Sequence, residues 1–333
     1  MKFIHTADWH IGKGQAYIPH TVERTLDAID AVYAKAAELG IYTVVQAGDV
    51  FDSPSVSDQD RYTFAHKLLS LDEAGFRTLI IPGNHDEIDK DLSALSYLSL
   101  LTEQGRFNRT VVANKTKLVV VDGTGFLLFA SEPWGSLDQH IDQVCEGSLD
   151  LDLDHLVVVA HTPMIGSTTS LGKVMTHGSE FKSDPRVTYC AYGDIHKYQR
   201  VGPRAYYSGA PLQTDFGEVC RTGVLVVDLD EPDDPNFVEI PSIRLATVNH
   251  GDPIPENSYA CIVYDDDKSE DKVEKLPPSV IKKKRKVDKV DLTDIQTAEA
   301  LFSGIEQILE KRGLNTEEVQ LAKQELDNAI VKG

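Results

Sequence analysis

The chain contains little cysteine, no long hydrophobic run and a marked shortage of positive charge. Its four cysteines include no Cys-x-x-Cys pair, so we expect reduced thiols in a reducing compartment, the cytoplasm. No apolar stretch approaches the roughly 18 residues that a membrane span needs, which argues against a membrane protein. The amino terminus begins within the first polar motif described below, so we also expect no signal peptide.

The charge balance restricts what the protein can hold by itself. Its 33 Lys and Arg residues face 53 Asp and Glu residues, which gives a formal net charge of −20. Because contacts to phosphate normally use Lys and Arg, we expect the isolated chain to hold nucleic acid weakly and to rely on a partner. Many acidic residues cluster in residues 147–154, 228–234 and 265–271, which we expect to face solvent. The net charge of the whole chain is therefore only weak evidence against nucleic-acid binding.

What the chain does contain is a series of polar motifs whose side chains are typical metal ligands. They are Asp8-Trp9-His10, Gly48-Asp49-Val50-Phe51-Asp52, Gly83-Asn84-His85-Asp86, Ala160-His161-Thr162-Pro163 and Gly193-Asp194-Ile195-His196. Each follows a short apolar or β-branched stretch: the one from Phe3, then 43–47, 77–81, 156–160 and 188–191. Each motif should therefore emerge at the carboxyl end of a strand, where open α/β sheets assemble their sites.

The residue types in these motifs suit two hard divalent ions, manganese or magnesium, better than softer metals. Two ions about 3.5–4 Å apart need one bridging carboxylate, and Asp49 is the natural bridge. The predicted ligand sets are Asp8, His10 and His196 for one ion and Asn84, His161 and Asp194 for the other. Two such ions would lower the pKa of a shared water and neutralise charge on the phosphorus of a phosphate ester. His85 could donate a proton to the oxygen that leaves this phosphorus.

Any single motif has a simpler interpretation, namely a polar turn satisfied by its own backbone. A lone Asp-x-His also occurs by chance. The occurrence of all the motifs in one order, each after a predicted strand, nevertheless favours a two-metal phosphoesterase.

The sequence also resembles a known family. Ile4 to Gly12 and the segment Tyr207 to Gln213, continuing to Glu218, are similar to segments of the SbcD-type DNA-repair nucleases, which are calcineurin-like metallophosphoesterases. The resemblance covers residues 1 to about 245. It implies a manganese-dependent double-strand exonuclease and single-strand endonuclease that works as a dimer with an SbcC-like ATPase of the SMC family.

Two positions depart from the family pattern. Asp52 stands where many members carry His, and Asp194 stands where the last motif usually carries His. Asp194 can still bind a hard metal, and its negative charge should bias the site toward manganese or magnesium. Asp52 cannot act as a protonated imidazole would, so it either orients His85 or a metal ligand or has a structural role.

The pattern along the chain predicts an α/β fold, and the family implies a four-layer αββα sandwich over residues 1–235. Helices are expected over Thr21 to Leu39, Asp58 to Ala74 and Asp91 to Thr102. The last two have apolar faces, which either pack on their own sheet or, as the resemblance implies, form a homodimer contact.

Residues 236–290 are expected to form a small α+β capping domain over the DNA, with strands over 237–248 and 258–264. The domain contains a basic run, made of Lys282, Lys283, Lys284, Arg285 and Lys286. Contact with the DNA backbone or a partner, plain solvated charge and nuclear import are three interpretations of this run, and we favour the first and regard import as the weakest.

Residues 291–333 read as a helical hairpin with two apolar stripes. Thr293 and Gln296 fit a capping box, Gly313 ends the first helix, and Asn315 with Glu318 opens the second. The hairpin could fold back on its own domain. The resemblance instead implies that it binds the coiled coil of the ATPase, and we favour this interpretation.

Two other functions remain open at the level of sequence. One is a metallophosphoesterase that acts on small phosphate esters, which would cleave nitrophenyl esters much faster than DNA. The other is a scaffold for the ATPase whose altered motifs have lost catalysis.

Overall fold

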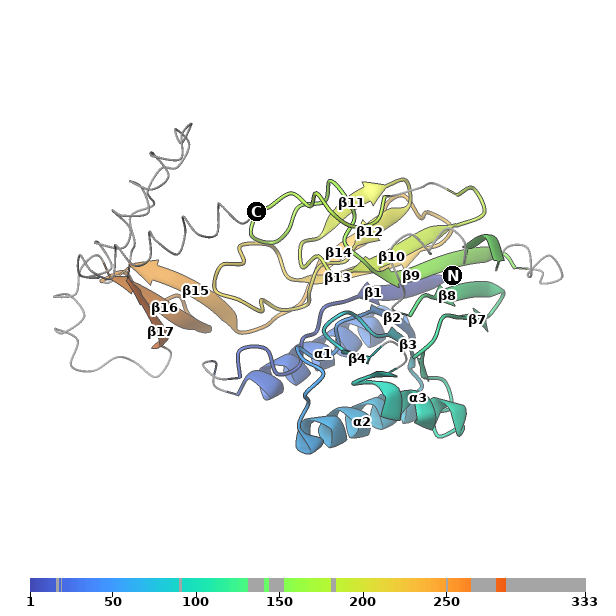
Figure 1. The fold of residues 1–333 in the computed structure, drawn as a ribbon, viewed down its shortest axis with the longest axis horizontal. Coiled ribbons are helices and arrows are strands. Elements are labelled where there is room, and N and C mark those ends of the chain that lie inside the picture. Colours follow the sequence, from blue (N-terminus) through green and yellow to red (C-terminus); the bar gives the residue numbers. More distant parts are fainter. Residues whose placement is uncertain are drawn as a thin grey trace, which may run out of the picture. The chain divides into compact units, whose positions relative to one another are not determined.

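The computed structural model describes residues 1–15, 18, 20–89, 92–130, 141–143, 153–180, 184–249, 251–264 and 280–285. Two six-stranded sheets dominate this part of the chain (Figure 1). The first has the order β14-β13-β1-β2-β3-β6, with β1 Lys2–Thr6, β2 Thr43–Ala47, β3 Arg77–Ile81, β6 Val111–Val112, β13 Gly223–Asp228 and β14 Asn236–Glu239. The second has the order β11-β12-β10-β9-β8-β7, with β7 Lys117–Val121, β8 Thr124–Leu128, β9 His155–His161, β10 Tyr189–Gly193, β11 Gln199–Gly202 and β12 Ala205–Tyr207.

The two sheets pack face to face because alternate side chains along each strand enter different cores. Phe3 of β1 lies in the core between the sheets, whereas its neighbour Ile4 lies in the core beneath the helices. In the second sheet, Val159 faces the core between the sheets and Val158 faces the outer core. The predicted sandwich of sheets flanked by helices is therefore confirmed.

Three helices cover the outer face of the first sheet (Figure 1). They are α1 Thr21–Glu38, α2 Asp58–Glu73 and α3 Ser96–Glu103. Helix α2 begins where the sequence predicts, because the Ser57 hydroxyl accepts a hydrogen bond from the Asp60 N–H at 3.1 Å.

The third helix starts later than the sequence predicts. Residues Leu92–Ser93 form strand β5, which pairs with β4 Glu87–Asp89, and the helix begins only at Ser96. The Ser93 hydroxyl accepts from the Leu95 N–H at 3.1 Å, and the Ser96 hydroxyl accepts from the Ser93 N–H at 2.9 Å. These side-chain hydrogen bonds stabilise a turn that competes with the first helical turn.

The apolar faces of α2 and α3 are divided between core and surface. Leu68 and Leu98 are buried against the first sheet, which confirms packing on the protein's own sheet for these residues. Tyr62 of α2 and Leu100 of α3 are 69% and 52% exposed, and Leu92, which lies in β5, is 54% exposed.

The polar motifs follow the strands as predicted. Strands β2 and β3 have the predicted bounds, and β9 and β10 differ from the predicted ones by one or two residues. Parallel pairing aligns β1 with β2, β2 with β3, and β9 with β10. The carboxyl ends of these strands therefore bring the motifs to one edge of each sheet.

A further three-stranded sheet is made of β15 Arg244–Asn249, β16 Ser258–Tyr264 and β17 Val280–Arg285. The expected strand over 237–248 is in fact two strands, β14 and β15, because Pro241 between them has no N–H to continue a ladder. The backbone of Lys282 to Arg285 belongs to β17, but their side chains and Lys286 lie outside the described residues. The predicted hairpin over 291–333 also lies outside them.

Candidate metal centre

The loops after β1 and β2 are held together by backbone hydrogen bonds. The Asp8 N–H donates to the Gly48 carbonyl at 3.0 Å, and the His10 N–H donates to the Asp49 carbonyl at 3.1 Å. Asp8, His10 and Asp49 have positive φ angles of 55°, 44° and 56°, and Asp194 has a φ of 102°. Left-handed conformations are unfavourable for residues other than glycine and concentrate at functional sites, so these loops are strained where the side chains converge.

Two glycines allow the side chains to approach each other closely. A Cβ atom on Gly48 would collide with the imidazole of His161, and one on Gly83 would collide with the carboxylate of Asp49. Gly48 also has a φ of 93°. These motif glycines are therefore required by packing within the site.

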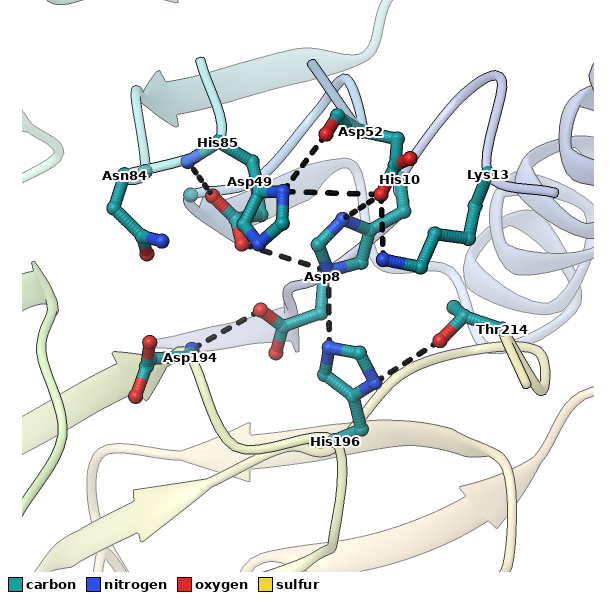
Figure 2. A network of polar contacts seen from close by, with 12 residues as sticks. Asp8, His10, Lys13, Asp49, Asp52, Asn84, His85, Asp194, His196 and Thr214 are labelled. Carbon is teal, nitrogen blue, oxygen red and sulfur yellow. Dashed lines mark hydrogen bonds and ion pairs between the residues drawn. The ribbon is translucent and has the colours of Figure 1, made fainter. Parts of the chain in front are cut away.

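The first group of side chains is made of Asp8, His10 and His196, and it lies beside Asp49 (Figure 2). Ligand atoms of Asp8, His10 and His196 lie within 4.8 Å of one another. The His10 Nε2 atom is 2.9 Å from His196 Nε2 and 3.5 Å from Asp49 Oδ2. Residues from loops after β1 and β10 thus meet although they are separated by nearly 190 positions in the sequence.

The second group surrounds the His161 imidazole. Its Nδ1 donates to the Ala47 carbonyl at 2.8 Å, so the Nε2 atom is free to face the site. That Nε2 lies 3.1 Å from Asn84 Oδ1, 3.3 Å from Asp49 Oδ2 and 3.8 Å from Asp194 Oδ1. All four residues belong to the ligand sets that the sequence predicts.

Asp49 connects the two groups. The same carboxylate atom, Asp49 Oδ2, is 3.5 Å from His10 Nε2 and 3.3 Å from His161 Nε2. Its other oxygen, Oδ1, accepts a hydrogen bond from the His85 N–H at 2.9 Å, which fixes the orientation of the carboxylate.

The pKa values of the converging groups are displaced in both directions. Burial raises the pKa of Asp8 to about 7 and lowers that of His10 to about 4. Burial opposes ionisation of both Asp49 and His161. The attraction between the negative Asp49 carboxylate and the positive His161 imidazole outweighs the effect of burial, so the pKa of Asp49 falls and that of His161 rises. Strongly displaced pKa values in one cluster are typical of functional sites.

An unsatisfied oxygen indicates that a cation fits this cluster. Asp8 is fully buried, and its Oδ2 atom has no hydrogen-bond partner in the described part of the chain. Leaving a buried carboxylate oxygen unpaired is costly unless a cation binds there. Carboxylate, amide and imidazole donors are those that hard divalent ions accept, so the residues present fit such ions.

Asp52 and His85 lie beside the first group. The His85 Nδ1–H donates to the backbone carbonyl of Asp52 at 2.7 Å. The Asp52 carboxylate oxygen Oδ1 is 3.5 Å from His10 Nδ1 and 2.8 Å from Lys13 Nζ. Asp52 thus contacts His85 through its backbone carbonyl and, at 3.7 Å, its carboxylate, and it contacts His10 through its carboxylate (Figure 2).

Two supporting carboxylates have no role among the sequence predictions. Glu218 Oε1 is 2.6 Å from His196 Nδ1, and although burial would lower the pKa of His196, Glu218 raises it to about 8. Asp86, buried between the loops, accepts from the N–H groups of Val50, Phe51 and Gly83 at 2.9–3.0 Å. Glu218 lies 22 positions after His196, so no spacing pattern could have revealed this contact.

The described helices include none that is long and apolar enough to cross a membrane.

Comparison with known proteins gives one family and several relatives. The family model described as calcineurin-like phosphoesterase matches residues 1–198. The SbcD subunit of the nuclease SbcCD of Escherichia coli is 22% identical over 255 residues, which cover 66% of this chain and 62% of that protein.

Two further relatives are similar at the same level. The DNA double-strand break repair protein Mre11 of Halobacterium salinarum is 29% identical over 62% of this chain and 55% of its own length. Mre11 of Archaeoglobus fulgidus is 26% identical over 98% of this chain and 77% of its own length. The chain spans less than two thirds of the Escherichia coli and Halobacterium proteins.

Proposed function

We propose that the chain, which belongs to the calcineurin-like phosphoesterase family, is the nuclease subunit of a DNA recombination and repair complex. It would hydrolyse phosphodiester bonds as a double-strand exonuclease and a single-strand endonuclease. The observation that carries the proposal is the position of Asp49 Oδ2, within 3.5 Å of both His10 Nε2 and His161 Nε2. A carboxylate between two ligand groups is what a two-metal site requires.

Asp8, His10 and His196 would hold one divalent ion, and Asn84, His161 and Asp194 the other, with Asp49 shared. The family implies divalent metal ions, and we propose manganese, with magnesium as the alternative. When bound, such ions supply an activated water and stabilise negative charge on the phosphate.

His85 is our proposed proton donor to the leaving oxygen. Its Nδ1 must be the donor in the hydrogen bond to the Asp52 carbonyl, because a carbonyl oxygen can only accept. A protonated His85 therefore keeps its Nε2–H available for the substrate. The His85 side chain is 37% exposed, as a group that meets a substrate needs to be.

DNA is the proposed substrate because the relatives described above are named as nucleases and DNA-break repair proteins. The basic run over Lys282 to Lys286 would contact the DNA backbone from a capping domain formed by residues 236–290. We propose the nuclease domain at 1–235 and an ATPase-binding hairpin at 291–333.

The proposed partners are an SbcC-like SMC-family ATPase and a second copy of the chain. Exposed apolar side chains within residues 58–102 support the dimer. Tyr62 is 69% exposed, Leu92 is 54% exposed and Leu100 is 52% exposed. Because Cys190 and Cys220 are free thiols, we propose a reducing location, the cytoplasm.

The test is to incubate the purified protein with end-labelled duplex and single-stranded DNA and manganese, with and without its ATPase partner. Asp49→Ala should lower cleavage by several orders of magnitude while the circular dichroism spectrum is unchanged. Asp27→Ala, which removes an exposed carboxylate from α1, is the matched control and should leave activity unchanged.

Two results would contradict the proposal. Faster cleavage of nitrophenyl phosphate esters than of DNA would indicate a small-molecule phosphoesterase. Metal binding without cleavage of DNA at any metal concentration, with or without the ATPase, would indicate a scaffold.

A further inference from the structure

Lys13 is a basic residue at the edge of the metal centre that none of the motifs includes. Its N–H donates to the His10 carbonyl at 3.0 Å, and its carbonyl accepts from the Thr21 hydroxyl at 2.6 Å. These bonds hold the backbone of Lys13 in the same loop that carries Asp8 and His10. The position of its side chain is therefore tied to that of the first ligand group.

The Lys13 ammonium points into the centre. Figure 2 shows its side chain reaching from the loop toward the Asp52 carboxylate, alongside His10. Its Nζ atom is 2.8 Å from Asp52 Oδ1, and the side chain is 31% exposed. An ammonium group has three N–H donors, so the contact with Asp52 leaves others for a ligand.

The same side chain lines a cavity beside the ligand groups. The cavity has a volume of about 310 Å³, and Lys13, Asp194, His196 and Thr214 are among its lining residues. Lys13 is the one Lys or Arg among the described residues that line it. A fragment such as a phosphate with its neighbouring sugar fits a space of this size.

The negative charge around the cavity explains why a phosphate group would need a positively charged side chain there in addition to the metal ions. Asp8, Asp49, Asp52, Asp194 and Glu218 all lie in or beside the site. Even with two divalent ions bound, these carboxylates leave no net positive charge to attract a phosphate diester. Asp52 and Asp194 each add a negative charge where an imidazole would add none.

We propose that Lys13, held in place by Asp52, is a phosphate-binding residue that contacts a nonbridging oxygen of the substrate backbone at the metal centre. The proposal rests on the proposed function, and it gives Asp52 a defined role as a positioning residue. The Lys13–Asp52 ion pair is partly exposed, and such pairs contribute little to the stability of a fold, so loss of a purely structural contact would have little effect on DNA binding.

The experiment measures binding separately from catalysis. Fluorescence anisotropy with a labelled single-stranded oligonucleotide in calcium, checked for absence of cleavage, gives Kd over a range of salt concentrations. Lys13→Gln should raise Kd roughly tenfold, the effect of one charge-assisted hydrogen bond, and lower the slope of log Kd against log salt by about 0.7. Lys13→Arg should retain most of the affinity.

A matched control is Lys35→Gln, because Lys35 is 30% exposed and is also paired with a carboxylate, Glu38. This variant should bind like the original protein. In a parallel assay with manganese and the p-nitrophenyl ester of thymidine monophosphate, Lys13→Gln should raise KM by a similar factor and leave kcat within about threefold.

Each outcome separates the Lys13 proposal from the nuclease proposal. If the original protein cleaves DNA but Lys13→Gln keeps its Kd, salt slope and KM, the Lys13 proposal is wrong and the nuclease proposal stands. If Lys13→Gln and Lys35→Gln weaken binding equally, Lys13 acts only through general surface charge, which also overturns the proposal. Failure of the original protein to cleave DNA would instead count against the proposed function.

Discussion

Two buried carboxylates in different regions of the molecule have opposite environments. Asp72, at the end of α2, accepts hydrogen bonds from the N–H groups of Asn108, Arg109 and Thr110 at 2.7–2.8 Å. Asp8, in the metal centre, accepts one from the Asp194 N–H at 3.0 Å through Oδ1, while no described residue bonds to its Oδ2.

Asp72 stabilises the fold through its hydrogen bonds, whereas Asp8 has an oxygen atom available to bind a metal ion. Burial opposes ionisation of both groups. At Asp72 the N–H donors outweigh burial and lower the pKa, whereas at Asp8 burial dominates and raises the pKa to about 7. A satisfied carboxylate contributes to stability, and an unsatisfied one lowers stability until a cation binds.

The largest predicted effect is at Asp8. Asp8→Asn should reduce nuclease activity at least about 100-fold, since even an outer partner of a metal ligand can contribute that much. The side-chain oxygen of Asn can still accept the Asp194 N–H, so the fold should be retained.

Without metal, the same substitution should not lower the melting temperature at pH 8. The pKa of Asp8 is raised to about 7 in the folded state, so the free energy of unfolding falls as pH rises from about 4 to about 7, and the full penalty is present at pH 8. Removing the carboxylate relieves that penalty. Calorimetric melting in EDTA between pH 5 and pH 8 tests this. A large loss of stability at pH 8 would show that Asp8 belongs with Asp72 as a structural group.

An intermediate effect is expected at Glu218, which orients the ligand His196 and is not itself among the predicted ligands. Glu218→Gln should weaken manganese binding by roughly 10- to 100-fold, because His196 loses the carboxylate that orients it. Isothermal titration calorimetry measures the change. Gln213→Ala, which removes a neighbouring side chain that forms hydrogen bonds with the Glu218 and Leu245 backbone, should have a much smaller effect on metal affinity.

A smaller effect is expected at Asp194, on the more open side of the centre. Asp194→His should remain active but shift the preference between manganese and magnesium, because an anionic ligand favours hard ions and an imidazole does not. Activity titrations with both metals on both forms give the comparison. Superimposable profiles would mean that Asp194 is not a ligand.

The smallest effect, on stability alone, is expected at Asp72. Asp72→Asn should lower the free energy of unfolding by about 1–3 kcal/mol at pH 7 and leave specific activity unchanged. Because the folded-state pKa lies below the ordinary value, this contribution is present above about pH 4 and disappears as pH falls through the folded pKa. A variant as stable as the original protein at pH 7 would remove the contrast with Asp8.

Much of the centre was predictable because strand ends and ligand types are local properties of the sequence. The bounds of β2 and β3 and the convergence of Asp49 with His161 follow from short β-branched stretches ending in polar motifs. The roles of Glu218 and Lys13 were not predictable, since they depend on loops brought together by the tertiary fold.

Single residues that interrupt a regular element explain the remaining differences between the predicted and the observed bounds of the helices and strands. The hydroxyls of Ser93 and Ser96 delay the start of α3, although the leucine spacing alone predicts an earlier start. Pro241 divides the predicted strand that began at Phe237, because it cannot donate to a ladder. Both effects involve single residues that an apolar pattern does not register.

The most direct test of the central claim is the stoichiometry and coupling of bound manganese. Titration calorimetry together with electron paramagnetic resonance should show two manganese ions per chain with exchange coupling through the Asp49 carboxylate. Asp49→Ala should abolish the coupling and weaken binding of at least one ion. A single ion per chain, or two uncoupled ions that are unaffected by Asp49→Ala, would contradict the account.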